Sequence, residues 1–292
     1  MKYALTIGIN YENSPYALRG CINDSLHIRN FLKQLQYNRI RVITDRTRVK
    51  PTKTNIQREL QRFVRESYRC SEMLLHYAGH GTNVRDTSGD EDDQKDEVLV
   101  PSDFRQNGYI TDDYINRVLQ KLNPKCRVIL LFDCCHSGTI ADIQYQTQEP
   151  GKFTLKNQNK IQAPIVMYSG CTDPQQSADA YNINNQKKWS GAMTSSFIRA
   201  LQPYIYKTQS VYQTLDNIRS FLKAKRYIQL PQLSVTNPNK LQLIGKNGFI
   251  QPARRRKSKW EIIQEIRRNR RERLRRRLER IRKRRESLSK RR

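Results

Sequence analysis

The apolar run from Val128 to Phe132 is the feature that most constrains the fold of this chain. It has the length of a β-strand and contains no polar residue. A strand that is apolar on both faces is typical of a parallel sheet covered by helices on both sides. The run ends abruptly in the polar segment Asp133–Gly138, which reads DCCHSG. Because open α/β sheets place their functional sites at the carboxyl ends of their strands, the sequence predicts a site that begins at Asp133.

Strands and helices are predicted to alternate on both sides of this run. The expected strands cover 3–9, 39–44, 72–77, 98–101 and 164–168, with short terminal ones at 231–235 and 241–244. The spacing of apolar residues predicts helices over 26–35, 52–68, 114–122, 191–201 and 211–222. Asn23, Asp24 and Ser25 can cap the first helix. The alternation indicates an α/β fold with a mostly parallel central sheet flanked by helices.

Two polar stretches interrupt this pattern. Residues 82–95 are acidic and predict a surface loop. Residues 142–162 are rich in Gln, Asn and Lys and predict a flexible internal linker. The 292 residues are enough for one large domain, expected over residues 1–250, and an appendage over residues 251–292.

The appendage carries most of the net charge of +28. From Arg254 to Arg292 there are 21 Lys or Arg and 5 Glu, a net charge of +16. Leu274, Leu278, Ile281 and Leu288 form a thin apolar seam at heptad spacing, which predicts a basic amphipathic helical tail. Such a helix is a candidate for binding a nucleic acid, an anionic membrane surface or an acidic partner. The alternatives are a solvated, partly disordered tail and a coiled coil, although self-repulsion argues against a homotypic one.

Cysteine usage and hydropathy bear on the compartment. The six cysteines show no framework spacing, no signal peptide precedes the first strand, and no apolar run approaches the ~18 residues of a transmembrane segment. We therefore expect free thiols in the reducing cytoplasm. The chain is also expected to be a monomer. The clusters Arg254–Lys257 and Arg282–Arg285 can act as nuclear signals, so the nucleus is a second expected location.

A second buried strand, Met73–Tyr77, also ends in a reactive side chain, because residues 77–81 read YAGHG. Parallel strands bring their carboxyl ends to one sheet edge, so His80 and Cys135 are expected side by side. A thiolate is a nucleophile, and a neighbouring imidazole can take its proton and return it to a leaving amine. The two residues are therefore a candidate dyad for acyl transfer.

Two other interpretations of these residues stay open at this point. A buried cysteine is often a small hydrophobic packing residue, and a single histidine is often structural. Zinc binding is the second alternative; its candidate ligands are Cys134, Cys135, His136, His76 and His80. Adjacent ligands do not easily converge on one ion, which argues against zinc.

Further motifs accompany the two segments, in order, over residues 3–245. They are GINY at 8–11, LRGCIND at 18–24, DEVLVPSD at 96–103, ITDD at 110–113 and SGCTDPQQSADA at 169–180. With YAGHG and DCCHSG, this ordered set resembles the metacaspases, the caspase-like cysteine peptidases of non-animal lineages. The resemblance implies a caspase-like fold and an endopeptidase that cleaves proteins after Arg or Lys.

The resemblance also implies roles for individual residues. Cys135 aligns with the nucleophile and His80 with the catalytic histidine. Asp24 and Asp133 align with acidic residues of the pocket that binds the side chain preceding the cleaved bond, and Cys21 belongs to the same pocket motif. Two carboxylates in a cleft suit this role, because they bind Arg or Lys through charge-assisted hydrogen bonds.

A calcium-stimulated, self-processing enzyme is a further implication of the resemblance. The residues that align with calcium ligands are Asp96, Asp112, Asp113 and Asp142, and carboxylate oxygens are the ligands that Ca²⁺ prefers. Candidate self-cleavage sites are Lys152, Lys156 and Lys160.

The sequence departs from the family pattern in three ways. Ala78 stands where Ser is common, no prodomain is expected because the first strand starts at Tyr3, and the basic tail has no counterpart. The net charge of the tail argues for an alternative function, a caspase-like scaffold whose tail binds nucleic acid or an acidic partner, whereas the intact His80 and Cys135 argue against it.

Overall fold

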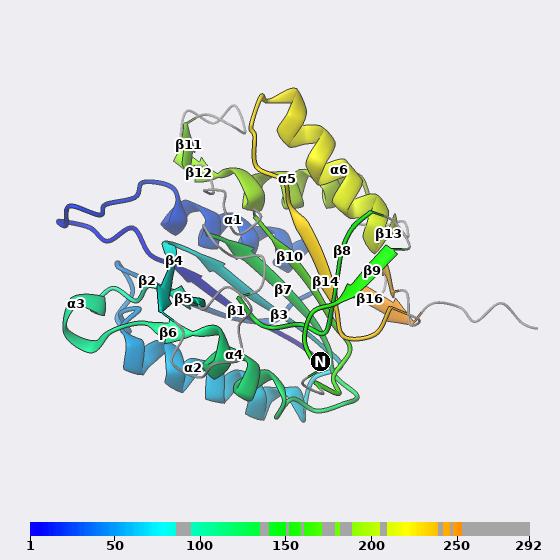
Figure 1. The fold of residues 1–292 in the computed structure, drawn as a ribbon, viewed down its shortest axis with the longest axis horizontal. Helices are drawn as coiled ribbons and strands as arrows, with labels where there is room; N and C mark the ends of the chain where they lie inside the picture. Colours follow the sequence, from blue (N-terminus) through cyan, green and yellow to red (C-terminus); the bar gives the residue numbers. More distant parts are fainter. Residues whose placement is uncertain are drawn as a thin grey trace, which may run out of the picture. The chain divides into compact units, whose positions relative to one another are not determined.

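The main sheet has eight strands in the order β2-β1-β3-β7-β10-β14-β8-β9 (Figure 1). This computed structural model describes residues 1–85, 95–134, 140–149, 152–158, 161–170, 179–181, 189–204, 209–238, 242–245 and 248–252. All of them belong to one unit, Met1–Pro252. Residues 253–292, for which a helix was predicted, lie outside the described residues.

Five neighbouring strands of this sheet are parallel. They are β2 (Arg39–Thr44), β1 (Lys2–Gly8), β3 (Glu72–Ala78), β7 (Arg127–Asp133) and β10 (Ile165–Ser169). The next three run antiparallel to their neighbours: β14 (Gln232–Val235), β8 (Tyr145–Glu149) and β9 (Lys152–Leu155). The predicted mostly parallel central sheet is therefore confirmed.

The predicted linker at 142–162 instead contributes β8 and β9 to this sheet, so that prediction is wrong for these strands. The hairpin lies at the edge of the sheet, where β9 exposes most of its side chains. β9, the outermost strand, is largely exposed and does not need an apolar pattern, while β8 buries the polar side chains of Gln146 and Thr147. The polar composition of β8 and β9 therefore gave no sign of strands in the sequence.

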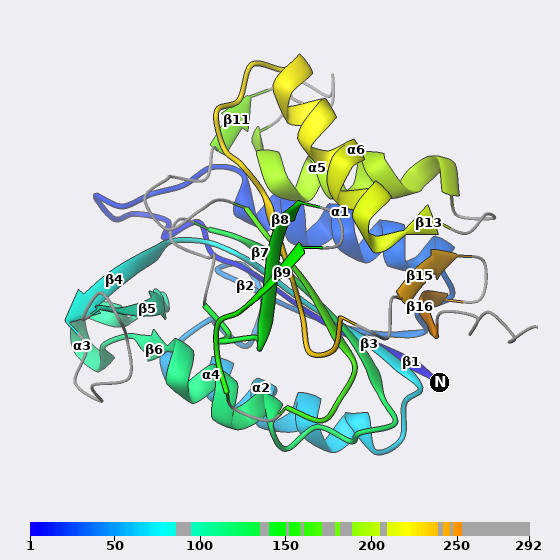
Figure 2. The same cartoon turned by 45° about the vertical axis from the view of Figure 1, so that its right-hand side comes forward.

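Helices cover both faces of the sheet (Figures 1 and 2). On one face lie α1 (Cys21–Gln34), α5 (Ala192–Leu201) and α6 (Val211–Ala224), and on the other lie α2 (Lys53–Ser67) and α4 (Asp112–Leu119). The side chain of Thr52 caps α2 by accepting the N–H of Asn55 at 3.3 Å. The predicted cap of α1 is wrong: this helix is preceded by Gly20, and Asp24 lies within its first turn.

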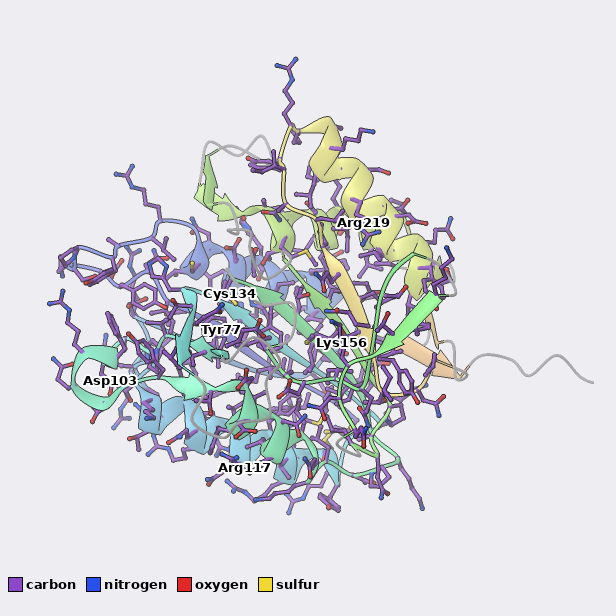
Figure 3. The ribbon with its side chains drawn as sticks, viewed as in Figure 1. Tyr77, Asp103, Arg117, Cys134, Lys156 and Arg219 are labelled. Carbon is purple, nitrogen blue, oxygen red and sulfur yellow. The ribbon has the colours of Figure 1, made fainter. Side chains whose placement is uncertain are left out.

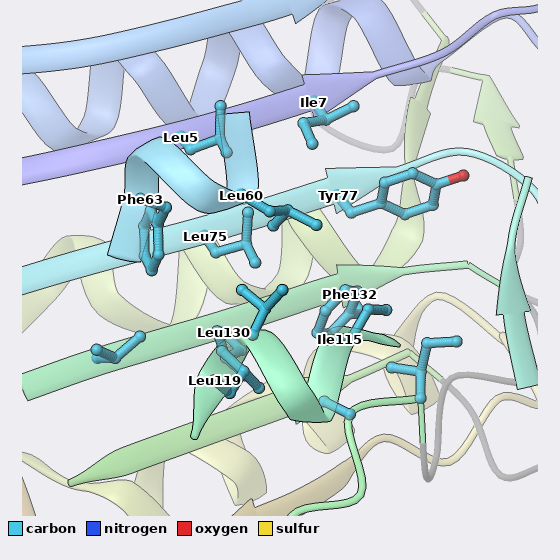
Figure 4. Close-up of a cluster of buried hydrophobic side chains, with 14 of the residues drawn as sticks. Leu5, Ile7, Leu60, Phe63, Leu75, Tyr77, Ile115, Leu119, Leu130 and Phe132 are labelled. Atoms are coloured by element: carbon cyan, nitrogen blue, oxygen red, sulfur yellow. The ribbon is translucent and has the colours of Figure 1, made fainter. Parts of the chain in front are cut away.

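Successive side chains of the central strands point to opposite faces and form two cores. Figure 4 shows the core beneath α2 and α4; its members include Leu5, Leu60, Phe63, Leu75, Leu119, Leu130 and Phe132. Leu74, Ile129 and Leu131 point to the other core, beneath α1, α5 and α6. Each fully buried side chain of this size stabilises the fold by roughly 1.5–3 kcal/mol. Burial on both faces explains the unbroken apolar run of β7 and the largely apolar sequence of β3, in which His76 is the one polar residue between Met73 and Tyr77.

Three small sheets complete the described fold. They are β4 (Gly81–Arg85), β5 (Lys95–Leu99) and β6 (Ile110–Thr111); β11 (Asp179–Tyr181) and β12 (Trp189–Gly191); and β13 (Gln209–Ser210), β15 (Gln242–Gly245) and β16 (Gly248–Pro252). The short α3 (Phe104–Asn107) follows β5, and a 3₁₀ turn (Gln202–Tyr204) follows α5. The loop predicted over 82–95 in fact begins within β4 and ends within β5. The β4–β6 sheet and the β11–β12 pair lie beside the carboxyl ends of the parallel strands of the main sheet (Figure 1).

Candidate active site

The carboxyl ends of β3 and β7 lie side by side. Ala78 pairs with Asp133 in parallel register, and the N–H of Gly79 lies 3.5 Å from the Asp133 carbonyl oxygen. His80 and Cys135 each stand two positions beyond this pair. The fold thus brings the ends of the two predicted catalytic segments together. Cys135 and the four residues after it lie outside the described residues.

His80 is oriented by a backbone carbonyl from a distant loop. Its Nε2 lies 2.7 Å from the carbonyl oxygen of Tyr16. A carbonyl oxygen can only accept a hydrogen bond, so in the neutral ring Nε2 carries the proton and Nδ1 bears the lone pair. This contact selects one tautomer and leaves Nδ1 as the basic atom.

The side chain of Tyr16 docks on α3. Its ring packs edge-on against Phe104 at a centroid distance of 5.4 Å. Arg105 donates from Nη2 to the Tyr16 hydroxyl at 3.2 Å and lies over the same ring. The carbonyl that faces His80 is therefore held by contacts on the β4–β6 side of the molecule.

The two predicted pocket carboxylates, Asp24 and Asp133, converge on Gly191 at the end of β12. The N–H of Gly191 donates to both carboxylate oxygens of Asp24, at 2.9 and 2.8 Å. The N–H of Thr194 donates to Oδ2 of Asp133 at 2.7 Å. A Cβ atom at Gly191 would lie 2.1 Å from Asp133 Oδ2 and 2.9 Å from Asp24 Oδ2, so only glycine fits. Both aspartates are buried, which concentrates negative charge at one place beside the strand ends.

Sequence reasoning missed the residues that hold these carboxylates. Ser190 donates from its hydroxyl to Oδ1 of Asp24, and it exchanges a second hydrogen bond of 2.9 Å with Ser195. Gly191 and Thr194 contribute the backbone N–H groups described above. The one local signal was the run of small residues around the start of α5, and that pattern alone does not say what it faces.

His76 is fully buried and has a structural environment. Its Nδ1 lies 2.8 Å from the hydroxyl of Thr6, and its Nε2 lies 3.1 Å from the hydroxyl of Thr194. Burial lowers the pKa of His76 to about 3, so the ring is neutral. Both ring nitrogens are engaged by hydroxyl groups, which argues against His76 as a zinc ligand.

The described cysteines are buried and form no disulfide bond; they are Cys21, Cys70, Cys126 and Cys134. Cys134 is 1% exposed and belongs to the core beneath α2 and α4, and Figure 3 shows it at the sheet end above Tyr77. Cys21 is the first residue of α1 and lies one turn before Asp24. Cys134 therefore has the environment of a packing residue.

Two of the segments predicted to bind calcium are tied to α4. Asp112, its buried first residue, accepts the N–H groups of Glu97 in β5 and of Asp113, both at 2.7 Å. Asn116, one turn later, donates to the backbone carbonyl of Asp142 at 3.0 Å. Asp142 is itself buried and has a left-handed backbone, with φ +46°.

The donor chemistry of these aspartates suits calcium. A carboxylate oxygen that accepts one N–H keeps a second lone pair, so the two hydrogen bonds that Asp112 accepts leave it able to bind a cation. Asp113 pairs with Arg117 at 3.1 Å, and the side chain of Asp96 lies outside the described ones. Among the side chains that are described, no three His, Cys, Asp or Glu groups gather closely enough to hold a metal ion.

Comparison with known proteins identifies the family to which this arrangement belongs. The sequence profile of the "Metacaspase, peptidase C14 domain" family matches residues 2–144. Metacaspase-1 of Scheffersomyces stipitis is 35% identical over 298 residues, which cover 83% of this chain and 72% of that protein. The chain belongs to the metacaspase family. Metacaspase-1B of Aspergillus oryzae is also 35% identical, and the match covers 81% of this chain and 68% of that protein.

A solved structure supports the fold of this metacaspase. The crystal structure of a protein from Geobacter sulfurreducens superposes with a TM-score of 0.62 at 22% identity, covering 86% of this chain and 99% of that one. Membership of the peptidase C14 metacaspases makes the chain a cysteine peptidase that acts on protein substrates. Within the described ranges, none of the helices combines the length and apolar character that a membrane span requires.

Proposed function

We propose that this metacaspase is an endopeptidase that cleaves after Arg or Lys. The observation that carries the proposal is the convergence of Asp24 and Asp133 on Gly191. Two buried carboxylates that lie close together raise the free energy of the folded protein, because they lose hydration and repel each other, unless a cation binds between them. A substrate guanidinium or ammonium group would offset that cost with charge-assisted hydrogen bonds. An acidic side chain, as in substrates of the animal caspases, would be repelled.

In the proposed reaction, Nδ1 of His80 takes the proton of the Cys135 thiol. The thiolate attacks the scissile carbonyl carbon, and the resulting tetrahedral intermediate collapses to a thioester as the amine leaves with the proton from His80. Water, activated by the same imidazole, then hydrolyses the thioester and restores the thiol. The hydrogen bond from Nε2 to Tyr16 supports this role, because it keeps Nδ1 available through both proton transfers.

A panel of short fluorogenic peptides tests the specificity. The peptides differ only in the residue before the cleaved bond, which is Arg, Lys, Gln or Asp. We expect cleavage after Arg and Lys only, and none by Cys135→Ala. Equal cleavage after Gln would overturn the role of the two carboxylates. An uncut panel would favour the scaffold alternative.

We propose calcium as the activator, held by Asp112 and Asp142 together with Asp96 and Asp113. A bound Ca²⁺ would be coordinated by the oxygens of these carboxylates and would offset their mutual repulsion. Two hydrogen bonds support this assignment, since they join the segments at α4. Asp112 accepts the backbone N–H of Glu97 in β5, and Asn116 donates to the carbonyl of Asp142. Asp142→Asn is expected to raise the calcium concentration needed for half-maximal activity. Asp216→Asn, on the exposed side of α6, is the matched control and should leave it unchanged.

Self-cleavage in the β8–β9 region is a further part of the proposal. Lys152 and Lys156 are exposed, and the backbone N–H of Lys156 donates to Gln144 at 2.8 Å (Figure 3 labels Lys156). A peptidase needs an extended, accessible backbone, so the hairpin must open before either bond is cut. Intact-mass measurement with and without calcium, beside Cys135→Ala, should reveal fragments ending at Lys. Fragments that also form with Cys135→Ala would contradict self-cleavage.

The basic tail suggests a second, separable function. We propose that its net charge of +16 binds nucleic acid through phosphates. The affinity for a double-stranded DNA of random sequence should fall steeply with salt and be lost on truncation after Pro252. Retention of that affinity by the truncated protein would assign binding to the peptidase domain instead.

A further inference from the structure

Tyr11 touches His80 in two independent ways. Its hydroxyl accepts the backbone N–H of His80 at 2.9 Å, and its ring lies 4.7 Å from the imidazole centroid at an interplanar angle of 36°. The same hydroxyl donates its own proton to the carbonyl of Val100 at 2.6 Å. The Tyr11 side chain therefore constrains both the backbone and the ring plane of His80.

A second tyrosine hydroxyl completes the contact. Tyr77 donates to the carbonyl oxygen of His80 at 2.8 Å, and its hydroxyl lies 3.3 Å from that of Tyr11. In Figure 4 the Tyr77 hydroxyl points to the carboxyl end of β3. A Cβ atom at Gly79 would lie 2.8 Å from the Tyr77 oxygen and 3.0 Å from the Tyr11 oxygen, so glycine leaves room for both. Burial raises the pKa of both hydroxyls well above their usual value, which keeps them protonated donors.

The backbone of Tyr11 is itself held in an uncommon conformation. Its φ is +51°, in the left-handed region that bulky residues rarely adopt. The N–H of the preceding Asn10 donates to Asp45 at 2.6 Å, and the carbonyl of Asn10 accepts the N–H of Leu18 at 2.8 Å. Strained backbone of this kind persists where surrounding contacts over-determine it, commonly at functional sites.

We propose that Tyr11 is a positioning residue for His80. Its hydroxyl fixes the backbone of His80 and its ring fixes the imidazole plane, while Tyr16 fixes the tautomer. One short loop, residues 10–18, thus supplies all three constraints on the base. The inference rests on the proposed role of His80 as the base of the reaction.

The kinetic test compares two buried tyrosines. Tyr11→Phe removes the hydroxyl that binds His80, whereas Tyr3→Phe removes a buried hydroxyl for which the described residues provide no hydrogen-bond partner. With an Arg peptide, kcat of Tyr11→Phe should fall about tenfold while KM changes little. The reason is that this variant loses the hydrogen bond between the Tyr11 hydroxyl and the backbone N–H of His80, the proposed base. Tyr3→Phe should match the wild type. Equal kinetics for the two variants would overturn the proposal.

A spectroscopic readout separates this inference from the peptidase proposal. The chain has 4 histidines, so ¹⁵N-histidine labelling gives few imidazole signals, and His80→Gln assigns its own. We expect His80 as the Nε2–H tautomer in the wild type and a clear shift or tautomer mixture in Tyr11→Phe, with the His76 signals unmoved. Unmoved His80 signals would refute the positioning role even if activity fell. Should Tyr11→Phe fold poorly, Tyr77→Phe is the second variant, with the same shift expected. A wild type that cuts no Arg or Lys peptide would overturn the proposed function alone.

Discussion

The carbonyl oxygen of Tyr16 lies 2.7 Å from Nε2 of His80, 64 residues further along the chain. The contact links a loop after β1 to the end of β3, and the ring of the same Tyr16 rests on α3. An imidazole held in this way has one free nitrogen, and that nitrogen can act as a base.

The two adjacent cysteines should differ completely in function. Cys135→Ala should abolish peptide cleavage, because the thiolate is the proposed nucleophile. Cys134→Ala should retain most of the kcat and lose roughly 1 kcal/mol of unfolding free energy, since it removes only a buried sulfur from the core. Peptide kinetics and urea unfolding measure the two effects. Activity that survives in Cys135→Ala and disappears in Cys134→Ala would reverse the assignment.

Neutralising either pocket carboxylate should weaken catalysis on basic substrates. Asp133→Asn keeps an oxygen that can accept from Thr194 but loses the charge. The value of kcat/KM for Arg peptides should fall roughly 10- to 100-fold, the range expected for one charge-assisted hydrogen bond. Asp24→Asn should act in the same direction, and the exposed Asp216→Asn serves as the charge-matched control. If all three variants behaved alike, the pocket would lie elsewhere.

Adding one methyl group at Gly191 should disturb both carboxylates together. The new Cβ would lie 2.1 Å from Asp133 Oδ2, so Gly191→Ala must displace a carboxylate that Thr194 also holds. We expect kcat/KM for Arg and Lys peptides to fall at least about tenfold and the unfolding free energy to fall by about 1–3 kcal/mol. Thermal unfolding and peptide assays on one preparation test this. An unaltered kcat/KM would show that substrate does not use this pocket.

Acid should destabilise the fold partly through His76. Its pKa in the folded state is about 3, below the ordinary 6.5, because burial disfavours the charged ring. The unfolded state therefore takes up a proton first, and stability falls as pH drops from about 6.5 to about 3. The loss from this group amounts to roughly 5 kcal/mol over that window.

His76→Gln provides the control for that prediction, because glutamine cannot titrate in this range. The variant should be less stable near neutral pH but lose less stability on acidification than the wild type. Urea unfolding at several pH values between 4 and 8 measures both slopes. Identical slopes would show that His76 does not contribute to the acid sensitivity.

The sequence by itself determined the alternation of strands and helices and the two segments that carry His80 and Cys135. Those features are local: an apolar run of strand length such as Val128–Phe132 is typical of a buried strand, and its sudden polar end predicts the edge of a sheet. Local pattern failed at β8 and β9, because the exposed edge strand β9 needs no apolar residues and β8 buries polar side chains instead.

Only the tertiary structure decided which distant residues meet. The strand register of β3 and β7 aligns Ala78 with Asp133, and the packing of α1 beside α5 brings Asp24 to Gly191, 167 residues away. The contacts of Tyr11 and Tyr16 with His80 use a hydroxyl, a ring and a backbone carbonyl. Every sequence contains many hydroxyl groups, rings and backbone carbonyls. Which of them meet depends on the tertiary fold, so no local sequence pattern predicts these contacts.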